Sequence, residues 1–593
     1  MLRDLKPLIR YMVRYRWGYL WGTLALIGNN AAGIAFPLLV GLAIGELNHV
    51  SSNPAALRHK TLFYAGLIVG NALVKGVFLY ASRWILIGIS REIEFDLRND
   101  LFRQLERQDA AYYQKNRTGD IMARLTNDLS AVRQLLGPAI MYSANTVMFS
   151  VGALYFLLRI SPWLTLVALA PMPIASILVQ YFGARIHERF ERIQASFSDI
   201  TAHAQENFSG ARLIRAFARE DSQIASFEKA NQQYIGRALP LVQLMAMLWP
   251  TLEFILGVAM VITFYAGGRL VLAHRIGVGQ FISFNTFMVM LTFPIIAVCW
   301  VINLFQRGTA SIKRIDEILR AEPAIDDRLA DPSLTPDLPI AGDLEFRGLN
   351  FSYGDRPVLT DIHLKVPAAS TLAIVGPTGS GKTTLVSLIP RLLDVDGETL
   401  LIDGRPIRSY PLATLRANIG VVPQETFLFS ETILENLRFG APNATDDQVM
   451  AAAEAAHIRK EFEEFPEGFS TMVGERGVTL SGGQKQRTSI ARALLRQPAI
   501  LILDDALASV DTYTEERILQ GLRTYTQNST RAQCTTILIS HRISTVREAD
   551  QIAVLENGRI LELGTHDQLL AKGGYYSGLY EKQLLEEELS VTG

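Results

Sequence analysis

Hydrophobic residues in the first half of the chain gather in runs of membrane-spanning length. A helix of about 20 apolar residues crosses the hydrocarbon core of a bilayer. Six runs before residue 310 meet that length, near residues 18–46, 61–89, 136–159, 162–183, 244–273 and 277–306. We therefore predict an all-α transmembrane domain of six helices over residues 1–320.

Two of the connections between these runs are long and strongly charged. Residues 90–135 and 184–243 are too polar to lie inside the membrane and too helical in pattern to be disordered. We expect each connection to extend a pair of transmembrane helices, with a short turn helix at its tip near residues 114–124 and 209–217. The other connections hold few basic residues. The preference of Lys and Arg for the cytoplasmic side therefore places the N-terminus and both long connections inside.

Polar residues interrupt the hydrophobic runs. Such groups must face the inside of the helix bundle or a wet cavity. They would either line a polar pathway or bond neighbouring helices. We favour helix–helix hydrogen bonds for the asparagines and keep both readings open for the one acidic residue, Glu253. The positions are Asn29, Asn30, Lys75, Arg83, Asn145, Glu253, Asn285 and Asn303.

The pattern changes near residue 340. Residues 321–342 are rich in Pro, Asp and Ala, as expected of a linker. Strand-like and helix-like segments then alternate to about residue 580. This alternation predicts an α/β domain over residues 343–582, followed by a C-terminal tail over residues 583–593.

A glycine-rich turn follows a buried strand in this α/β region. The segment "TLAIVGPTGSGKTTLVSLI" fits G-x-x-x-x-G-K-[ST], with Gly376, Gly381, Lys382 and Thr383 at the motif positions. The glycines let backbone N–H groups close around phosphate oxygens at the start of a helix. Lys382 reaches the β- and γ-phosphates, and the Thr383 hydroxyl binds Mg²⁺. The motif predicts a nucleoside triphosphate site, which GTPases, kinases and helicases also possess.

Two further segments place polar side chains near this turn. "LSGGQKQRTSIARALL" (480–495) opens with small residues and continues as a helix, with Ser481 as its N-cap. Asp504 ends the strand in "ILILDDALASVD" and is suited to Mg²⁺, and His541 follows the strand in "TTILISHRIS". Ligands of such sheets bind at the carboxyl ends of the strands, so we expect Lys382, Asp504 and His541 to converge.

Composition agrees with a chain of two kinds of domain. Its 593 residues are too many for one hydrophobic core. Hydrophobic residues make up 49% and charged residues 19%, which indicates a membrane part joined to a soluble part. The net charge of −1 gives no indication of a nucleic-acid partner. Cys299 and Cys534 lie far apart, and we predict two buried thiols and no disulfide.

The motifs, in their order, resemble those of the ATP-binding cassette (ABC) superfamily: "GPTGSGKT", "VVPQETFLFSETILENL", "LSGGQ", "LILDD" and "ISHR". The resemblance covers nearly the whole chain. It is to half-transporters of the six-helix exporter type, which includes bacterial multidrug and lipid exporters. It implies a domain-swapped exporter fold with a P-loop nucleotide-binding domain, ATP and Mg²⁺ as cofactors, and ATP hydrolysis coupled to transport. It also implies an inner-membrane protein whose nucleotide-binding domain is cytoplasmic.

The resemblance assigns roles by motif position. Tyr353 would stack on adenine, Gln424 would sense Mg²⁺ and the attacking water, and His541 would hold the γ-phosphate and help orient water. Asp511 would reach across a dimer, and "GERGVT" (474–479) would touch a coupling helix. The implied set is Asp505, His541 and Gln424 for catalysis; Thr383, Gln424 and Asp504 for the metal; and Tyr353, Gly376, Pro377, Thr378, Gly379, Ser380, Gly381, Lys382, Thr383, Thr384, Ser481, Gly482, Gly483 and Gln484 for the nucleotide.

The same resemblance implies that one chain cannot complete a nucleotide site. Each nucleotide would lie between Lys382 of one subunit and Ser481, Gly482 and Gly483 of another. A dimer of half-transporters follows. The tips of the two long connections are then coupling helices, which make the transporter inward-open when the nucleotide domains part and outward-open when they close.

Asp505 departs from the family pattern, in which a Glu follows the Mg²⁺-binding Asp and polarises the attacking water. The Asp505 carboxylate is one methylene shorter, and a misplacement of about 1 Å costs about a hundredfold in rate. A positioned base contributes about 10² to 10⁴-fold, so the site should be slow rather than inert. Either the chain is the ATP-holding member of a heterodimer, which the resemblance favours, or a homodimer works at a reduced rate. The unaltered His541 supports the homodimer.

The sequence therefore predicts half of an ATP-driven exporter or flippase for lipophilic or amphipathic compounds, such as drugs or lipids. Membrane lipid and a second half-transporter would be its partners. Two alternatives stay open: a siderophore-type importer with an exporter fold, and an ATP-gated regulator or channel, which only Asp505 supports. A soluble cassette ATPase acting on DNA or ribosomes is excluded by the membrane spans in the same chain.

Overall fold

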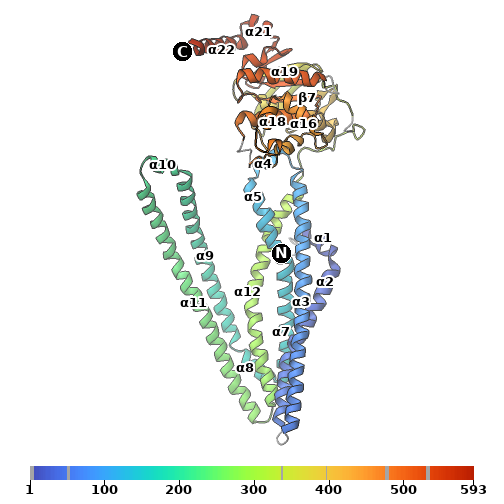
Figure 1. Cartoon of the computed structure of the whole chain (residues 1–593). Helices are drawn as coiled ribbons and strands as arrows, with labels where there is room; N and C mark the ends of the chain where they lie inside the picture. The colour runs from blue at the N-terminus through green and yellow to red at the C-terminus, as the bar shows by residue number, and fades with distance from the viewer. Residues whose placement is uncertain are drawn as a thin grey trace. The chain divides into compact units, whose positions relative to one another are not determined.

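The computed structural model describes residues 6–49, 54–335, 338–395, 397–474, 480–528 and 534–592. The chain divides into two compact units (Figure 1). The first unit holds Met1–Leu105 and Gly119–Arg320 and is helical. The second holds Glu106–Thr118 and Ala321–Gly593 and contains both sheets of the structure. The predicted combination of an all-α membrane part and an α/β part is confirmed.

The first unit is built from long helices. Among the described residues, five helical stretches are long and apolar enough to cross a membrane. The sixth expected span lies in α12, where the apolar run that meets the description, Val278–Thr292, is shorter. The helices are α1 (Lys6–Arg14), α2 (Arg16–His49), α3 (Pro54–Leu105), α5 (Thr118–Ala123), α6 (Leu129–Gln134), α7 (Ile140–Ile160), α8 (Pro162–Leu169), α9 (Met172–Ser209), α10 (Ala211–Ala216), α11 (Glu220–Leu272) and α12 (Val278–Arg320), with π-helical turns η1 (Arg124–Asp128) and η2 (Leu135–Ala139) on either side of α6.

Several helices extend well beyond the membrane, as the charged connections predict. α3 has 52 residues, which is about 78 Å at the rise of an α-helix, more than twice the thickness of a hydrocarbon core. The short helix α10 joins α9 to α11 at the expected tip near residues 209–217. At the other tip, α4 (Ala110–Lys115) begins four residues earlier than the expected 114–124, because the Asp109 carboxylate caps it by accepting a hydrogen bond from Tyr112 N (2.8 Å).

Two membrane helices approach closely where glycines face each other. A Cβ added to Gly279 on α12 would lie 2.1 Å from the carbonyl oxygen of Gly41 on α2. Near this contact, Ser283 Oγ on α12 donates a hydrogen bond to Pro37 O on α2 (2.9 Å). Small residues of this kind let helix backbones pack directly inside a membrane.

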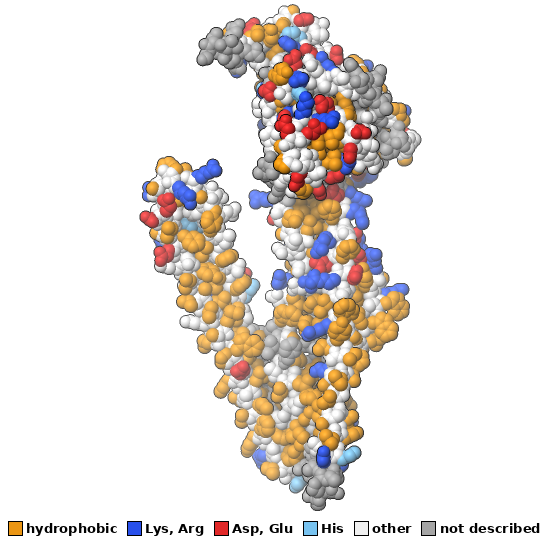
Figure 2. Space-filling model, viewed as in Figure 1, with side chains coloured by type: hydrophobic (Ala, Val, Ile, Leu, Met, Phe, Trp, Pro, Cys, Tyr) orange, Lys and Arg blue, Asp and Glu red, His pale blue; other side chains and the backbone are white. Residues whose placement is uncertain are grey.

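Other membrane helices leave broad apolar surface uncovered. None of the membrane window of α3 is buried, and only 11% of the window of α11 is buried. Figure 1 shows α9 and α11 side by side, diverging from α2, α3, α7 and α12 toward α10, and Figure 2 shows hydrophobic side chains along these helices. A surface of this size is available to lipid or to a second subunit.

The second unit contains two sheets. A four-stranded antiparallel sheet has the order β2-β1-β4-β5, and a six-stranded sheet has the order β10-β9-β3-β8-β7-β6. In the larger sheet β6, β7, β8, β3 and β9 are parallel, and β10 is an antiparallel edge strand. The strands are β1 (Leu344–Tyr353), β2 (Arg356–Val366), β3 (Thr371–Val375), β4 (Leu400–Ile402), β5 (Arg405–Pro406), β6 (Ile419–Val422), β7 (Ile500–Asp504), β8 (Thr535–Ile539), β9 (Gln551–Glu556) and β10 (Arg559–Gly564).

Helices cover the larger sheet and complete two hydrophobic cores. One core lies between the sheets, around Leu344, Leu372 and Ile502. The other lies between the larger sheet and the helices, around Leu501 and Ile490. These helices, in addition to α4, are α13 (Lys382–Leu388), α14 (Leu412–Ala417), α15 (Ile433–Arg438), α16 (Asp446–Ala455), α17 (Arg459–Glu463), α18 (Gly482–Leu495), α19 (Thr512–Asn528), α20 (Ile543–Val546), α21 (His566–Lys572) and α22 (Tyr575–Thr592).

Two remaining expectations concern the cysteines and the end of the chain. Cys534 precedes β8 and is half-buried, and its burial raises the pKa of its thiol to about 11. The side chain of Cys299 lies outside the described residues. Residues 583–592, which the sequence sets apart as a tail, continue helix α22.

The close approach of α2 and α12 generates a stability prediction. Gly279→Ala should lower the apparent melting temperature of the detergent-solubilised protein, because the new methyl group must push the two backbones apart. Overpacking of this kind costs about 1–3 kcal/mol. Gly268→Ala is the control, since a Cβ at Gly268 meets nothing within 4 Å. Equal melting temperatures for the two variants would contradict the predicted close contact.

Candidate nucleotide site and membrane pocket

Four neighbouring strands of the larger sheet deliver the polar residues of the candidate site. β3, β8, β7 and β6 are parallel, so their carboxyl ends share one edge of the sheet. Lys382, Asp504, His541 and Gln424 follow or end these strands. All four line one pocket of about 320 Å³. The expected convergence of Lys382, Asp504 and His541 is therefore found, with Gln424 beside them.

The loop after β3 requires glycine where it turns. Gly376 has φ +147°, and a Cβ there would lie 2.0 Å from Leu555 O. Gly381 has φ +102° and directly precedes α13. Thr378, Gly379, Gly381, Thr383 and Thr384 line the pocket. In the same loop Pro377 O accepts a hydrogen bond from Lys382, and the buried Ser380 Oγ has no hydrogen-bond partner among the described atoms.

The ammonium group of Lys382 faces this pocket without a bonded carboxylate. Its Nζ donates hydrogen bonds to Gly376 O and Pro377 O, each at 2.9 Å. Burial lowers the pKa of Lys382, although the negative charges of Asp504 and Asp505 oppose the shift. An anionic group in the pocket would restore the charged form. Lys382 is therefore suited to binding phosphate.

Asp504 and Thr383 place two hard oxygen donors together. Thr383 Oγ1 donates a hydrogen bond to Asp504 Oδ1 (3.2 Å). Burial raises the pKa of Asp504, and the nearby Asp505 raises it further, so a cation here would be stabilising. No cluster of three or more His, Cys, Asp or Glu occurs among the described residues. These two oxygens fit Mg²⁺, which takes few protein ligands and completes its shell with phosphate and water.

Asp505 contacts His541 at the mouth of the pocket. His541 Nδ1 lies 3.2 Å from Asp505 Oδ1. Asp505 has φ +49°, and its backbone N donates to Ile539 O (3.1 Å), so its conformation is fixed against the neighbouring strand. The side chain of His541 is 63% exposed. The two groups lie where the sequence expects a base and a γ-phosphate ligand.

The remaining predicted residues lie beside this pocket or apart from it. Tyr353 is 45% exposed, and its hydroxyl lies 3.5 Å from Thr384 Oγ1, at the edge of the pocket. Ser481 and Gln484 form a capping box at the start of α18, which confirms Ser481 as an N-cap. Residues 481–484 do not line the pocket of their own chain, and Ser481 and Gly482 are exposed. Residues 475–479 of "GERGVT" lie outside the described residues.

Sequence reasoning did not identify Arg542 as part of this region. Its Nη1 donates to Val510 O (2.8 Å) and to Glu515 Oε2 (2.6 Å), and its Nη2 donates to Ala508 O (3.3 Å). Arg542 thus joins the loop after β8 to the loop after β7. The only sequence signal was its position directly after His541.

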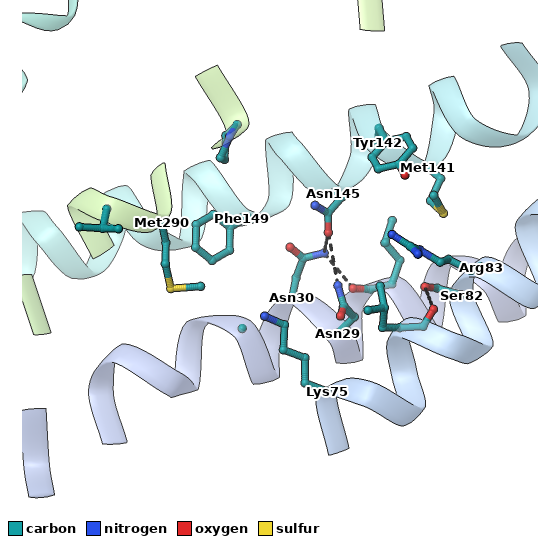
Figure 3. A pocket seen from close by; sticks show the side chains of 15 residues that line it. Asn29, Asn30, Lys75, Ser82, Arg83, Met141, Tyr142, Asn145, Phe149 and Met290 are labelled. Carbon is teal, nitrogen blue, oxygen red and sulfur yellow. Dashed lines mark hydrogen bonds between the residues drawn. The ribbon is translucent and has the colours of Figure 1, made fainter. Parts of the chain in front are cut away.

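A second pocket lies inside the first unit, among α2, α3, α7 and α12. It has a volume of about 430 Å³ and mixed lining: apolar side chains such as Leu26, Phe149 and Met290 together with polar ones. Figure 3 shows Lys75 and Arg83 reaching from α3 toward asparagines on α2 and α7. The lining contains no acidic residue. Among the described side chains, neither Lys75 nor Arg83 forms an ion pair.

The asparagines of this pocket bond neighbouring helices, as expected. Asn145 Oδ1 on α7 accepts hydrogen bonds from Asn30 Nδ2 (3.1 Å) and Asn29 Nδ2 (3.4 Å) on α2. They also line the pocket, so the two readings coincide here. Asn285 instead donates to Phe281 O of its own helix (3.0 Å), and Asn303 and Glu253 are exposed.

Comparisons with known proteins agree with both sites. Residues 19–295 match the family model for the ABC transporter transmembrane region, and residues 359–508 match that for the ABC transporter. The chain is 36% identical over 590 residues to the probable multidrug resistance ABC transporter ATP-binding/permease protein YheI of Bacillus subtilis, covering 99% of this chain and 98% of that protein. It is 36% identical over 519 residues to the ATP-dependent lipid A-core flippase of Syntrophus aciditrophicus, covering 87% and 85%.

A solved structure shares the fold over nearly the whole chain. It is a bacterial Atm1-family ABC exporter with ATP bound, with a TM-score of 0.77, 25% sequence identity, and coverage of 96% of this chain and 98% of that one. Fold, motif order and full-length relatives therefore agree: the chain belongs to the ABC transporter superfamily, as an exporter half-transporter with a transmembrane region and an ATP-hydrolysing nucleotide-binding domain.

Proposed function

We propose that this chain is half of an exporter or flippase that moves amphipathic compounds outward across the cytoplasmic membrane, with its N-terminus and nucleotide-binding domain in the cytoplasm. The observation that carries the proposal is the membrane pocket, where apolar walls meet the cations Lys75 and Arg83. An unpaired cation at membrane depth is costly, so it marks a wet cavity or a ligand path. The apolar lining suits a lipophilic body, and the two cations suit an anionic group on the same molecule.

The nucleotide pocket supplies the driving reaction. ATP, when bound with Mg²⁺, provides the phosphoryl group whose hydrolysis releases the energy for transport. Lys382 binds phosphate, and Thr383 and Asp504 hold the cation through their oxygens. Gln424 and His541 contact the attacking water or the γ-phosphate from the neighbouring strand ends.

A second subunit completes each site. Ser481, Gly482 and Gly483 are placed outside the pocket of their own chain, with Ser481 and Gly482 exposed. Their exposure at the start of α18 is what a segment needs to bind a nucleotide held by another subunit. The uncovered apolar faces of α3 and α11 supply further surface for such a partner in the membrane.

The Asp505 site should hydrolyse ATP slowly. In the structure, the Asp505 carboxylate contacts His541, so the group that would polarise water already has a partner. We favour a heterodimer in which this site mainly holds ATP and the partner carries a Glu. A homodimer with two slow sites is the alternative. An importer and an ATP-gated regulator have no observation of their own in the structure.

Lys382→Ala should weaken nucleotide binding at this chain's site by about 10–100-fold, the effect of losing a charged hydrogen-bond donor worth about 1.5–3 kcal/mol. Photolabelling of the purified complex with an azido-ATP analogue measures the change. Lys365→Ala, an exposed lysine of β2, is the matched control. Labelling of the Lys382→Ala chain at the wild-type level would refute the assignment.

Asp505→Glu should raise ATP turnover at this site, by up to about a hundredfold, because the longer side chain restores the reach of the base. Hydrolysis in single-turnover conditions, followed on the labelled chain itself, checks the gain. Asp505→Asn should lose further rate, since it cannot accept a proton. No gain from the longer carboxylate would show that its length does not limit the site.

Lys75→Met with Arg83→Met should abolish the stimulation of ATPase activity by amphiphiles that carry a negative charge, while basal ATPase activity persists. Lys75→Arg is the charge-retaining control and should keep the stimulation. The ATPase rate of the complex in lipid nanodiscs, measured with an anionic amphiphile and its neutral analogue, gives the answer. Undiminished stimulation by the anionic compound would exclude this pocket as its binding site.

A further inference from the structure

The C-terminal helix α22 reaches back to the loop that carries His541. The side-chain amide of Gln583 uses both of its polar groups there. Its Nε2 donates a hydrogen bond to His541 O (2.5 Å), and its Oε1 accepts one from Ile543 N (2.8 Å). The two bonds bracket Arg542, so one side chain fixes the backbone on either side of this residue.

Helix α22 is anchored firmly enough to hold Gln583 in place. The Glu562 carboxylate of β10 accepts hydrogen bonds from Tyr575 N (2.6 Å) and Tyr576 N (3.3 Å) at the first turn of α22. The Tyr576 side chain is fully buried, and its hydroxyl lies 2.8 Å from His566 Nδ1. Gln583 lies seven residues after Tyr576, two turns along the same face of the helix. The helix therefore extends from a buried anchor to the His541 loop.

The loop is gripped from its other side by Arg542. The Arg542 guanidinium donates to Val510 O, to Ala508 O and to the buried carboxylate of Glu515. These bonds fix the loop relative to the segment after Asp505. Gln583 fixes it relative to the C-terminal helix.

The His541 side chain itself is poorly held. It is 63% exposed, and its one described polar contact is with Asp505. Without close packing, the position of the imidazole follows from the position of its backbone. That backbone is held by Gln583.

We propose that Gln583 is a positioning residue for ATP hydrolysis, which sets the place of His541 through the backbone of its loop. The inference extends the ATPase activity of the family to a residue of the C-terminal helix, outside the motifs that define the nucleotide site. Each hydrogen bond contributes about 1 kcal/mol of net stability, so losing both frees the loop without unfolding the domain. A displacement of His541 by about 1 Å would slow the reaction by up to about a hundredfold.

The test is Gln583→Met, which keeps the length of the side chain and removes both hydrogen bonds. Leu585→Ala, at an exposed residue of the same helix, is the matched control. The complex is photolabelled with azido-ATP carrying either an α- or a γ-phosphate label. Loss of γ-label relative to α-label then reports hydrolysis on this chain alone. The measurement is made in the wild-type and Asp505→Glu backgrounds, together with the melting temperature of each variant.

Gln583→Met should slow the loss of γ-label about tenfold, while α-labelling and melting temperature match those of Leu585→Ala. Gln583→Glu keeps the acceptor for Ile543 N and loses the donor to His541 O, so it should fall between the two. Unchanged γ-label loss in Gln583→Met would overturn the inference. So would parallel losses of nucleotide binding and melting temperature, which would mark a structural role.

The result separates this inference from the proposals about Asp505. If Asp505→Glu gives no gain but Gln583→Met still slows hydrolysis, the base proposal fails and the positioning role stands. If γ-label stays on this chain in both backgrounds, His541 has no turnover to position here, and the inference is overturned although nucleotide binding is intact.

Discussion

The common ending of four parallel strands at one edge of a sheet is the constraint on which the nucleotide chemistry of this chain depends. β3, β8, β7 and β6 are hydrogen-bonded neighbours, and almost every residue of β3 and β7 is buried. The strands cannot slide without moving their side chains out of the two cores that they separate. Their ends therefore bring together residues far apart in sequence, such as Thr383 and Asp504, which are 121 positions apart.

This constraint also explains why so much of the nucleotide site could be predicted from the sequence. Lys382, Asp504 and His541 each follow an apolar strand, and the geometry of parallel sheets does the rest. Gln583 could not be found in this way. It lies in a helical segment with no motif, and its bonds to His541 and Ile543 cross 42 and 40 residues. Only the anchoring of α22 on β10 decides that the two segments meet.

The membrane unit shows the same division. Hydrophobic run length predicts where its helices lie, since the hydrocarbon core fixes how long an apolar helix must be. Run length does not predict which helices touch. The contact of Gly41 with Gly279 and the bonds of Asn29 and Asn30 to Asn145 join helices that are distant in sequence. The asparagines could be expected to bond a neighbour, but their shared pocket with Lys75 appears only when α2, α3, α7 and α12 are assembled.

The contacts around His541 also join the two nucleotide-binding surfaces of one chain. Arg542 bonds the carbonyl groups of Ala508 and Val510. Between them, Ser509 N donates to Gln486 Oε1 of α18 (3.0 Å), the helix whose exposed start carries Ser481. The loop at this chain's own pocket and the segment suited to another subunit's nucleotide therefore belong to one hydrogen-bonded body. Because Gln583 holds that body at His541, a change in the position of α22 would be felt at both surfaces. An Asp505 site that turns over slowly could then still affect the partner's site, since its contribution depends on how this body is held and not only on its own rate.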